Sequence, residues 1–273
     1  MGAQRYRAIV AYDGTAYCGF QIQAHGETIQ GELERALQSA TQEPVRVAGA
    51  GRTDAGVHAH GQVISFETRW RHGVAELERA LNALLPDDIV VRDLALADAR
   101  FHARYSARWR TYRYWVYYAP AGQPLLQRYA WGLGWRPDLA AMRRAAEHLL
   151  GAHDFAAFGQ APGGGHTVRE VRRAVWRRRA RPPWAGAGVE LWEYEIAANG
   201  FLRGMVRRVV GTLLLVGSGE LSVEGFAAVL ASRDPARSGA PAPARGLTLW
   251  GVEYGDGRQG AGPEGTTTLP PGQ

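Results

Sequence analysis

Several ingredients are scarce or missing in this chain of 273 residues. It contains no lysine, so its 32 basic side chains are all arginines, which excludes lysine Schiff-base chemistry and a Walker-type phosphate loop. Its one cysteine, Cys18, excludes an internal disulfide and a cysteine-rich metal site, and fits a reducing cytoplasm. Apolar runs of transmembrane length and a signal-peptide core are also missing, so we expect a cytoplasmic protein without a membrane anchor.

The charge balance is basic, with a formal net charge of +6 at pH 7. Arginines alternate with aromatic residues in two stretches, Arg104 to Tyr118 and Arg169 to Arg181, and the second stretch contains Trp176. Guanidinium groups pair with phosphates, and aromatic faces stack on bases, so this pattern favours a protein that binds nucleic acid. The alternative is a pair of solvated strand faces in an arginine-rich protein.

The segment from Gly49 to Gln62, GAGRTDAGVHAHGQ, is the most informative part of the chain. It places Asp54 in a glycine-rich turn directly before a predicted strand, with Arg52 two residues earlier. We expect the Arg52 cation to keep Asp54 ionised at neutral pH, which suits a nucleophile or a base. The alternative is an Asx-turn at a strand end, with Asp54 bonded to its own backbone.

Two other motifs in this segment point to chemistry that the sequence does not support. His58 and His60 stand two residues apart, but no cysteine or third histidine lies nearby, so we predict no metal site. Gly49 and Gly51 resemble the start of a dinucleotide-binding loop, but the third glycine is missing.

Hydrophobic periodicity predicts the order β-α-β-β-α-β in the first part of the chain. Thr28 is the expected N-cap of the first helix, and Pro86 follows the second. The expected elements are a strand at 6–12, a helix to about residue 42, strands at 45–48 and 62–67, a helix at 74–85 and a strand at 89–94.

The second part repeats this order without a repeat of the residues themselves. The expected elements are a strand at 111–118, a helix at 138–150, strands at 171–177 and 189–197, helices at 202–216 and 223–231, and a strand at 247–254. We therefore predict an α+β fold made of two ferredoxin-like halves, 1–107 and 108–254, with antiparallel sheets that meet at a central cleft and helices on the outer side. The Gly- and Pro-rich residues 255–273 are predicted to form a disordered tail.

The string GRTDAGVHAHGQV resembles the active-site segment of the tRNA pseudouridine synthase A family. The resemblance spans nearly the whole chain up to Tyr254. It is carried by YDGTAYCGFQIQ, TIQGELERAL, FHARYSARWRTYRYWVYY, DFAAF, NGFLRGMVRRVVGTLLLVG and ARGLTLWGVEY.

This resemblance implies the reaction and its requirements. Asp54 would be the catalytic residue for the conversion of uridine to pseudouridine at positions 38 to 40 of the tRNA anticodon arm. The bond between N1 and C1′ breaks, the uracil turns over, and C5 bonds to C1′. Asp54 adds to the sugar carbon covalently or removes a sugar proton to give a glycal, and the sequence leaves both routes open. The resemblance also implies a homodimer that needs no cofactor or metal.

Four further residues match substrate-binding positions of the family. Tyr112 would pack on the target base, and its hydroxyl is a candidate for helping to remove the C5 proton. Arg207 would pair with the catalytic aspartate, Arg52 would assist extrusion of the base, and Leu247 would line the uracil pocket. The alternatives are a packing tyrosine, a surface arginine and a core leucine.

Two positions depart from the family pattern: Gly159 stands where an arginine is common, and Gly204 stands where a bulkier residue is common. Two rival functions remain open from the sequence. One is a non-catalytic RNA-binding protein or chaperone that kept the fold, and the other is a nucleoside hydrolase that releases free base.

Overall fold

The computed structural model describes residues 2–161 and 165–255. The predicted disordered tail lies outside this range except for Gly255. Within the described residues, none of the helices combines the length and the apolar character that crossing a membrane requires.

The first part of the chain confirms the predicted order of elements. Thr28 caps α1, because its side chain accepts a hydrogen bond from the amide of Gly31 at 3.2 Å. The strand predicted at 45–48 is only a two-residue strand in the structure, and it lies further along the chain. The elements are β1 (Gln4–Tyr12), α1 (Ile29–Thr41), β2 (Ala48–Gly49), β3 (His58–Thr68), α2 (Val74–Leu84) and β4 (Ile89–Leu96).

The second part contains three short elements that the sequence pattern did not predict, namely α3, β6 and β7. They have three or four residues each, too few for a hydrophobic period to show. The prediction that α5 begins at residue 202 is wrong, because Gly204 adopts a left-handed φ of 71° at the N-cap. The elements are β5 (Ala107–Tyr118), α3 (Pro124–Gln127), β6 (Trp131–Leu133), α4 (Leu139–Glu147), β7 (Gly151–Asp154), β8 (Val168–Arg179), β9 (Glu190–Ala198), α5 (Met205–Gly217), α6 (Val223–Ser232) and β10 (Leu247–Tyr254).

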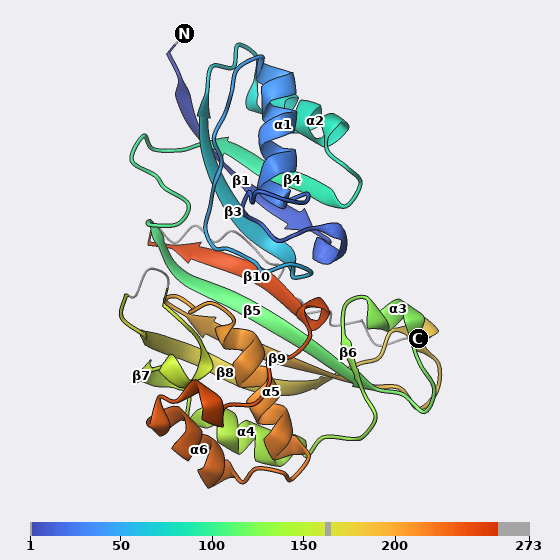
Figure 1. The fold of residues 1–273 in the computed structure, drawn as a ribbon. Helices are drawn as coiled ribbons and strands as arrows, with labels where there is room; N and C mark the ends of the chain where they lie inside the picture. Colours follow the sequence, from blue (N-terminus) through green and yellow to red (C-terminus); the bar gives the residue numbers. More distant parts are fainter. Residues whose placement is uncertain (1, 162–164, 256–273) are drawn as a thin grey trace, which may run out of the picture.

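The strands form one mixed, mostly antiparallel ten-stranded sheet. Eight strands follow the order β4-β1-β3-β10-β5-β9-β8-β7, while β2 pairs with β3 and β6 pairs with β5 outside this path. Instead of two separate sheets there is one continuous sheet, because β10 is inserted between β3 and β5 (Figure 1). It pairs antiparallel with β5 but parallel with β3, where Thr248 faces His58. The starts of β3 and β10 therefore lie side by side, and so do the loops that precede them. The division into two halves stays a prediction.

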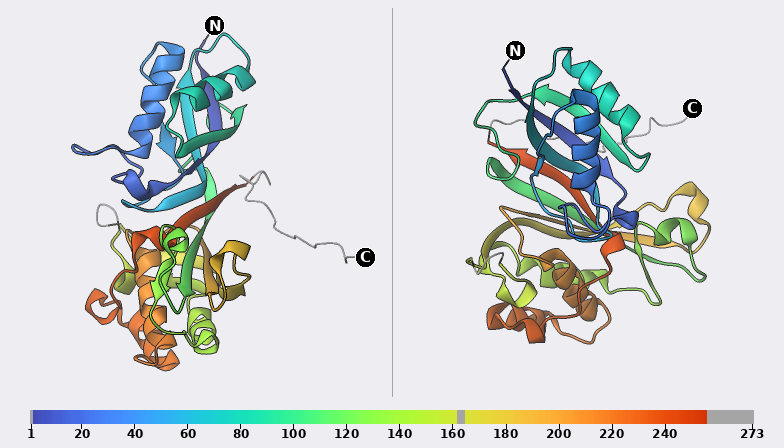
Figure 2. Two further views of the ribbon diagram at one scale, coloured as in Figure 1. Left: turned by 90° about the vertical axis from the view of Figure 1, so that its right-hand side faces the viewer. Right: turned by 45° about the horizontal axis from the view of Figure 1, so that its top comes forward.

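Helices pack against the sheet in two groups. α1 and α2 pack beside the N-terminal strands, while α4, α5 and α6 contact one another beside the C-terminal strands (Figure 1). Figure 2 shows α1 and α5 on the same side of the sheet. The apolar face of α5 is buried, including Val209, Val210 and Leu213 at 0% exposure. Each such side chain contributes about 1.5–3 kcal/mol by its burial, so α5 is held firmly in place.

Candidate active site

The turn that carries Asp54 is held by its own backbone and by β3. The amide of Val57 donates to the Asp54 carbonyl at 3.1 Å, and Gly56 has a φ of 75° that disfavours other residues. Before the turn, the side chain of Gln62 from β3 donates to the Gly51 carbonyl at 2.6 Å and accepts from the Gly51 amide at 3.3 Å. Gln62 is fully buried, so this pair of hydrogen bonds fixes the position of the turn relative to β3.

A second set of contacts holds Thr53, the residue directly before Asp54. Its hydroxyl lies 2.8 Å from the hydroxyl of Tyr12 on β1, and its carbonyl accepts from the Phe20 amide at 3.0 Å. Gly19 approaches so closely that a Cβ there would lie 2.7 Å from the Thr53 carbonyl oxygen. Asp54 therefore sits on a rigid backbone, although its side chain is 41% exposed and can reach a ligand.

Arg207, on the first turn of α5, is the cation that faces Asp54. Its Nη1 lies 3.5 Å from Oδ2 of Asp54. Its Nε donates to the Ala242 carbonyl at 2.6 Å, and the Ala242 amide donates back to the Arg207 carbonyl at 2.9 Å. A partly exposed ion pair contributes only about 0–1 kcal/mol to stability. Its effect is to orient the carboxylate and to keep a positive charge beside it.

Tyr112 projects from β5 close to the same turn. It is buried at 7% exposure, and its ring meets Phe201 edge to face at 5.0 Å between centroids. Burial raises the pKa of Tyr112 to about 12, with Arg110 opposing the shift and Asp54 adding to it. The hydroxyl therefore stays protonated at neutral pH and can donate a hydrogen bond.

Leu247 and Arg52 have different positions relative to this group. Leu247 begins β10, is 6% exposed and faces Tyr114 of β5 in the register. Arg52 is exposed and makes no ion pair with Asp54, which pairs with Arg207 instead. The chain turns Arg52 outward, and a residue distant in sequence, Arg207, takes the place beside the aspartate.

Arg110 is a structural centre of the site that the sequence reasoning missed. Its guanidinium donates five hydrogen bonds to four backbone carbonyls: two to Ala50 at 3.2 and 3.1 Å, and one each to Arg104, Ala107 and Asn199 at 2.6, 3.2 and 2.9 Å. It ties together the loop before Asp54, the joint before β5 and the loop before α5. The only feature of the sequence that points to this role is the position of Arg110, two residues before Tyr112.

His58 and Asp13 form a second missed cluster. Nδ1 of His58 accepts a hydrogen bond from the Gly14 amide at 3.1 Å and lies 3.1 Å from Oδ1 of Asp13. Nε2, on the other side of the ring, lies 3.1 Å from the carbonyl oxygen of Arg245. Burial lowers the pKa of His58 and outweighs the opposing Asp13 carboxylate. Asp13 also accepts from Arg128 at 2.7 Å.

His60 lies in different surroundings from His58. Its ring stacks on Trp250 at 4.4 Å between centroids, so the two histidines do not share a ligand. Across residues 2–161 and 165–255, no group of three or more His, Cys, Asp or Glu side chains could hold a metal ion.

The two arginine-rich strands serve internal pairing more than the pattern suggested. Glu193 and Glu195, at 0% and 2% exposure, pair with arginines of β5 and β8. Trp176 is fully buried and packs on Tyr194, so it cannot stack on a base. The arginines that carry these pairs are Arg113, Arg173, Arg177 and Arg179.

Backbone contacts explain one of the two departures from the family pattern. A Cβ at Gly159 would lie 2.7 Å from the Cβ of Leu202 and 2.8 Å from the Arg203 carbonyl oxygen, so an arginine cannot replace it without a shift of the chain. Gly204 meets nothing within 4 Å, and its left-handed backbone alone accounts for the glycine.

The carboxylate of Asp54 on its fixed turn, the guanidinium of Arg207 beside it and the buried Tyr112 form one candidate site. The family model described as tRNA pseudouridine synthase matches residues 8–106 and 145–255. Over 250 residues the chain is 46% identical to tRNA pseudouridine synthase A of Chloroflexus aurantiacus, with 91% of this chain and 88% of the relative covered. It is 42% identical over 257 residues to that of Geobacillus kaustophilus, with 93% and 95% covered.

The chain belongs to the tRNA pseudouridine synthase A family and is an isomerase of that class, which confirms the resemblance seen in the sequence. A solved structure of an unknown protein from Galdieria sulphuraria covers 80% of this chain and is itself covered to 94%, at 14% identity and a TM-score of 0.19. That likeness is too small to support a conclusion.

Proposed function

We propose that this chain converts uridine to pseudouridine in the anticodon arm of tRNA, at positions 38 to 40, with Asp54 as its catalytic residue. The single observation that carries the proposal is the ion pair between Asp54 and Arg207, 3.5 Å apart beside the buried Tyr112, in a member of this family. These three residues lie far apart in the sequence, and packing alone does not require them to meet.

In this mechanism Asp54 acts at the sugar carbon as the uracil departs. It adds to C1′ while N1 leaves, or it removes a sugar proton to give a glycal. In the covalent route C5 then attacks C1′ and displaces the carboxylate, N1 takes up a proton and C5 loses one. The pKa of about 12 favours Tyr112 as a hydrogen-bond donor that supports the base over a phenolate that removes the C5 proton.

The remaining residues bind the substrate. Leu247 lines the uracil pocket at the start of β10, next to the turn that carries Asp54. Arg52 is exposed at the mouth of the site, where it can take the place of the extruded base or hold its phosphate. No cofactor or metal is needed, because the isomerisation neither oxidises nor reduces the nucleotide. A homodimer, two functional halves and a cytoplasmic location are proposed from the family resemblance and the lone Cys18.

The test uses tRNA transcripts tritiated at C5 of uracil, with release of tritium and of free uracil measured together. Isomerisation releases tritium and no uracil, a nucleoside hydrolase releases uracil, and an RNA-binding protein without catalysis releases neither. Asp54→Ala should stop tritium release while the Kd for the transcript stays within about threefold. Asp98→Asn, which removes an exposed carboxylate after β4, is the matched control. Substantial turnover by Asp54→Ala would remove Asp54 from its role.

A further inference from the structure

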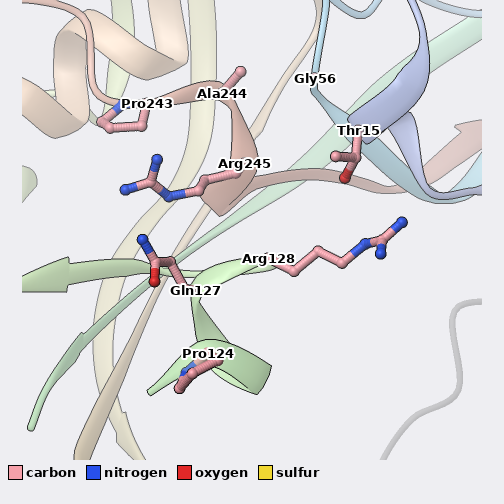
Figure 3. Close-up of a pocket in the computed structure, with 8 residues that line it drawn as sticks. All are labelled: Thr15, Gly56, Pro124, Gln127, Arg128, Pro243, Ala244 and Arg245. Carbon is pink, nitrogen blue, oxygen red and sulfur yellow. The ribbon is translucent and has the colours of Figure 1, made fainter. Parts of the chain in front are cut away.

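An open cavity of about 510 Å³ lies beside the turn that carries Asp54, and the assigned residues do not use it. It is lined by Thr15, Gly56, Pro124, Gln127, Arg128, Pro243, Ala244 and Arg245 (Figure 3). We call it the Arg245 groove. Its volume falls within the range of about 300–1,000 Å³ typical of small-ligand sites, which suits one nucleotide.

The groove is continuous with the candidate active site. Gly56 lies two residues after Asp54, and it forms one wall. Ala244 lies beside Gly56, and Pro243 before it directly follows Ala242, whose carbonyl holds Arg207. A chain bound with one nucleotide at Asp54 would therefore place a neighbouring nucleotide at the groove.

The chemistry of the lining fits a phosphodiester. None of its eight residues is acidic, and two are arginines. Figure 3 shows the side chains of Arg245 and Gln127 turned toward each other across the groove, and Arg128 extended toward Thr15. Arg128 is already engaged with Asp13 through its Nε at 2.7 Å. The Nε of Arg245 is buried and has no hydrogen-bond partner in the part of the chain that the structure describes. Because this nitrogen forms no bond within the described residues, it does not tie the guanidinium to a protein group, and the terminal Nη groups are the ones that can donate to a phosphate in the groove.

The backbone of Arg245 is fixed relative to the catalytic turn. Its carbonyl oxygen forms a hydrogen bond with Nε2 of His58 at 3.1 Å, and His58 lies four residues after Asp54. The following Gly246 packs so tightly that a Cβ there would lie 2.5 Å from the ring of Tyr114. The backbone from which the Arg245 side chain extends is therefore held in place relative to the turn that carries Asp54.

We infer that the Arg245 groove binds the RNA strand next to the target uridine, with the guanidinium of Arg245 on a backbone phosphate and Gln127 on the same nucleotide. Pro124, Pro243 and Ala244 supply apolar contacts to its sugar or base. Arg245 is then a substrate-binding residue outside the uracil pocket. This inference rests on the proposed function, because it takes the ligand to be the substrate RNA.

The test compares the full-length wild type with Arg245→Gln and Arg245→Lys. The matched control is Arg71→Gln, which removes an exposed arginine beyond the far end of β3. The probe is an unmodified anticodon stem-loop transcript, with Kd measured over a range of KCl concentrations and kcat and KM from tritium release. Melting curves in chloride establish that each variant is folded.

Arg245→Gln should raise Kd and KM about tenfold and leave kcat within about twofold. The slope of log Kd against log salt should fall by about 0.7–0.9, the value for one lost phosphate contact. Arg245→Lys should keep the slope but not the full affinity, because lysine lacks the two-pronged donor geometry. Arg71→Gln should match the wild type.

A wild-type Kd and salt slope in Arg245→Gln would overturn the inference. So would a fall in kcat at unchanged Kd, since Arg245 would then support the catalytic turn and not the RNA. Inorganic phosphate at constant ionic strength tests the remaining source of the ligand. If it raises the melting temperature of the wild type but not of Arg245→Gln while RNA binding is equal, the groove is a free-anion site and the inference fails.

The binding measurements separate this inference from the proposed function. RNA binding with an Arg245-dependent slope but no tritium release would contradict the proposed function alone. Tritium release together with a salt slope of Kd that is the same in the wild type and in Arg245→Gln would contradict only the inference about the Arg245 groove.

Discussion

Replacement of Arg110 by methionine tests whether one half-buried side chain holds the active site together. Methionine keeps much of the volume and removes all five hydrogen bonds to the carbonyls of Ala50, Arg104, Ala107 and Asn199. A hydrogen bond from a charged donor contributes about 1.5–3 kcal/mol, but the bonds share one side chain and water can reach some of the carbonyls. We therefore expect a total loss of about 3 kcal/mol.

For a chain of this size, that loss corresponds to a fall in Tm of about 6 °C. The loop before Asp54 and the loop before α5 would also separate slightly, and a displacement of about 1 Å can cost about 100-fold in rate. Calorimetry and tritium release measure the two effects, while the RNA Kd should change by less than about threefold. Arg108→Met, an exposed arginine on the same strand, is the matched control. If Arg110→Met has the Tm and kcat of the wild type, the hydrogen bonds of Arg110 do not hold the loops of the site together.

Three further predictions concern single contacts. Tyr112→Phe should slow isomerisation and leave RNA binding intact, because the hydroxyl that donates a hydrogen bond to the base is lost, and wild-type single-turnover rates would exclude the hydroxyl from the mechanism. Arg207→Lys should lower kcat about 10- to 100-fold, because lysine cannot reach both Asp54 and the Ala242 carbonyl, and unchanged kcat would show that the pair is dispensable. The third concerns pH. The pKa of His58 is below its value in the unfolded chain, so neutral His58 contributes stability above about pH 6.5 that is lost as the pH falls. Between pH 7.5 and pH 5 the melting temperature should fall more steeply for the wild type than for His58→Gln. An equal fall in both proteins would contradict this prediction.

The sequence determined the elements whose pattern is local. Hydrophobic period and capping residues located α1, α2 and β10, because the side chains that decide them are neighbours along the chain. The GRTDAGVH string placed Asp54 on its turn before β3, because the glycines and the following apolar run are adjacent. The short α3, β6 and β7 carry no such period, and they form only where other strands and loops offer them partners.

The tertiary structure decided which charges meet. The local pattern placed Arg52 beside Asp54, and only the family resemblance paired Asp54 with Arg207. The fold brings up Arg207, because β10 enters the sheet next to β3 and carries the Ala242 segment with it. The same insertion places Arg245 at the edge of the catalytic turn. A parallel pairing between residues 190 positions apart leaves no trace in local composition, so only the folded chain reveals it.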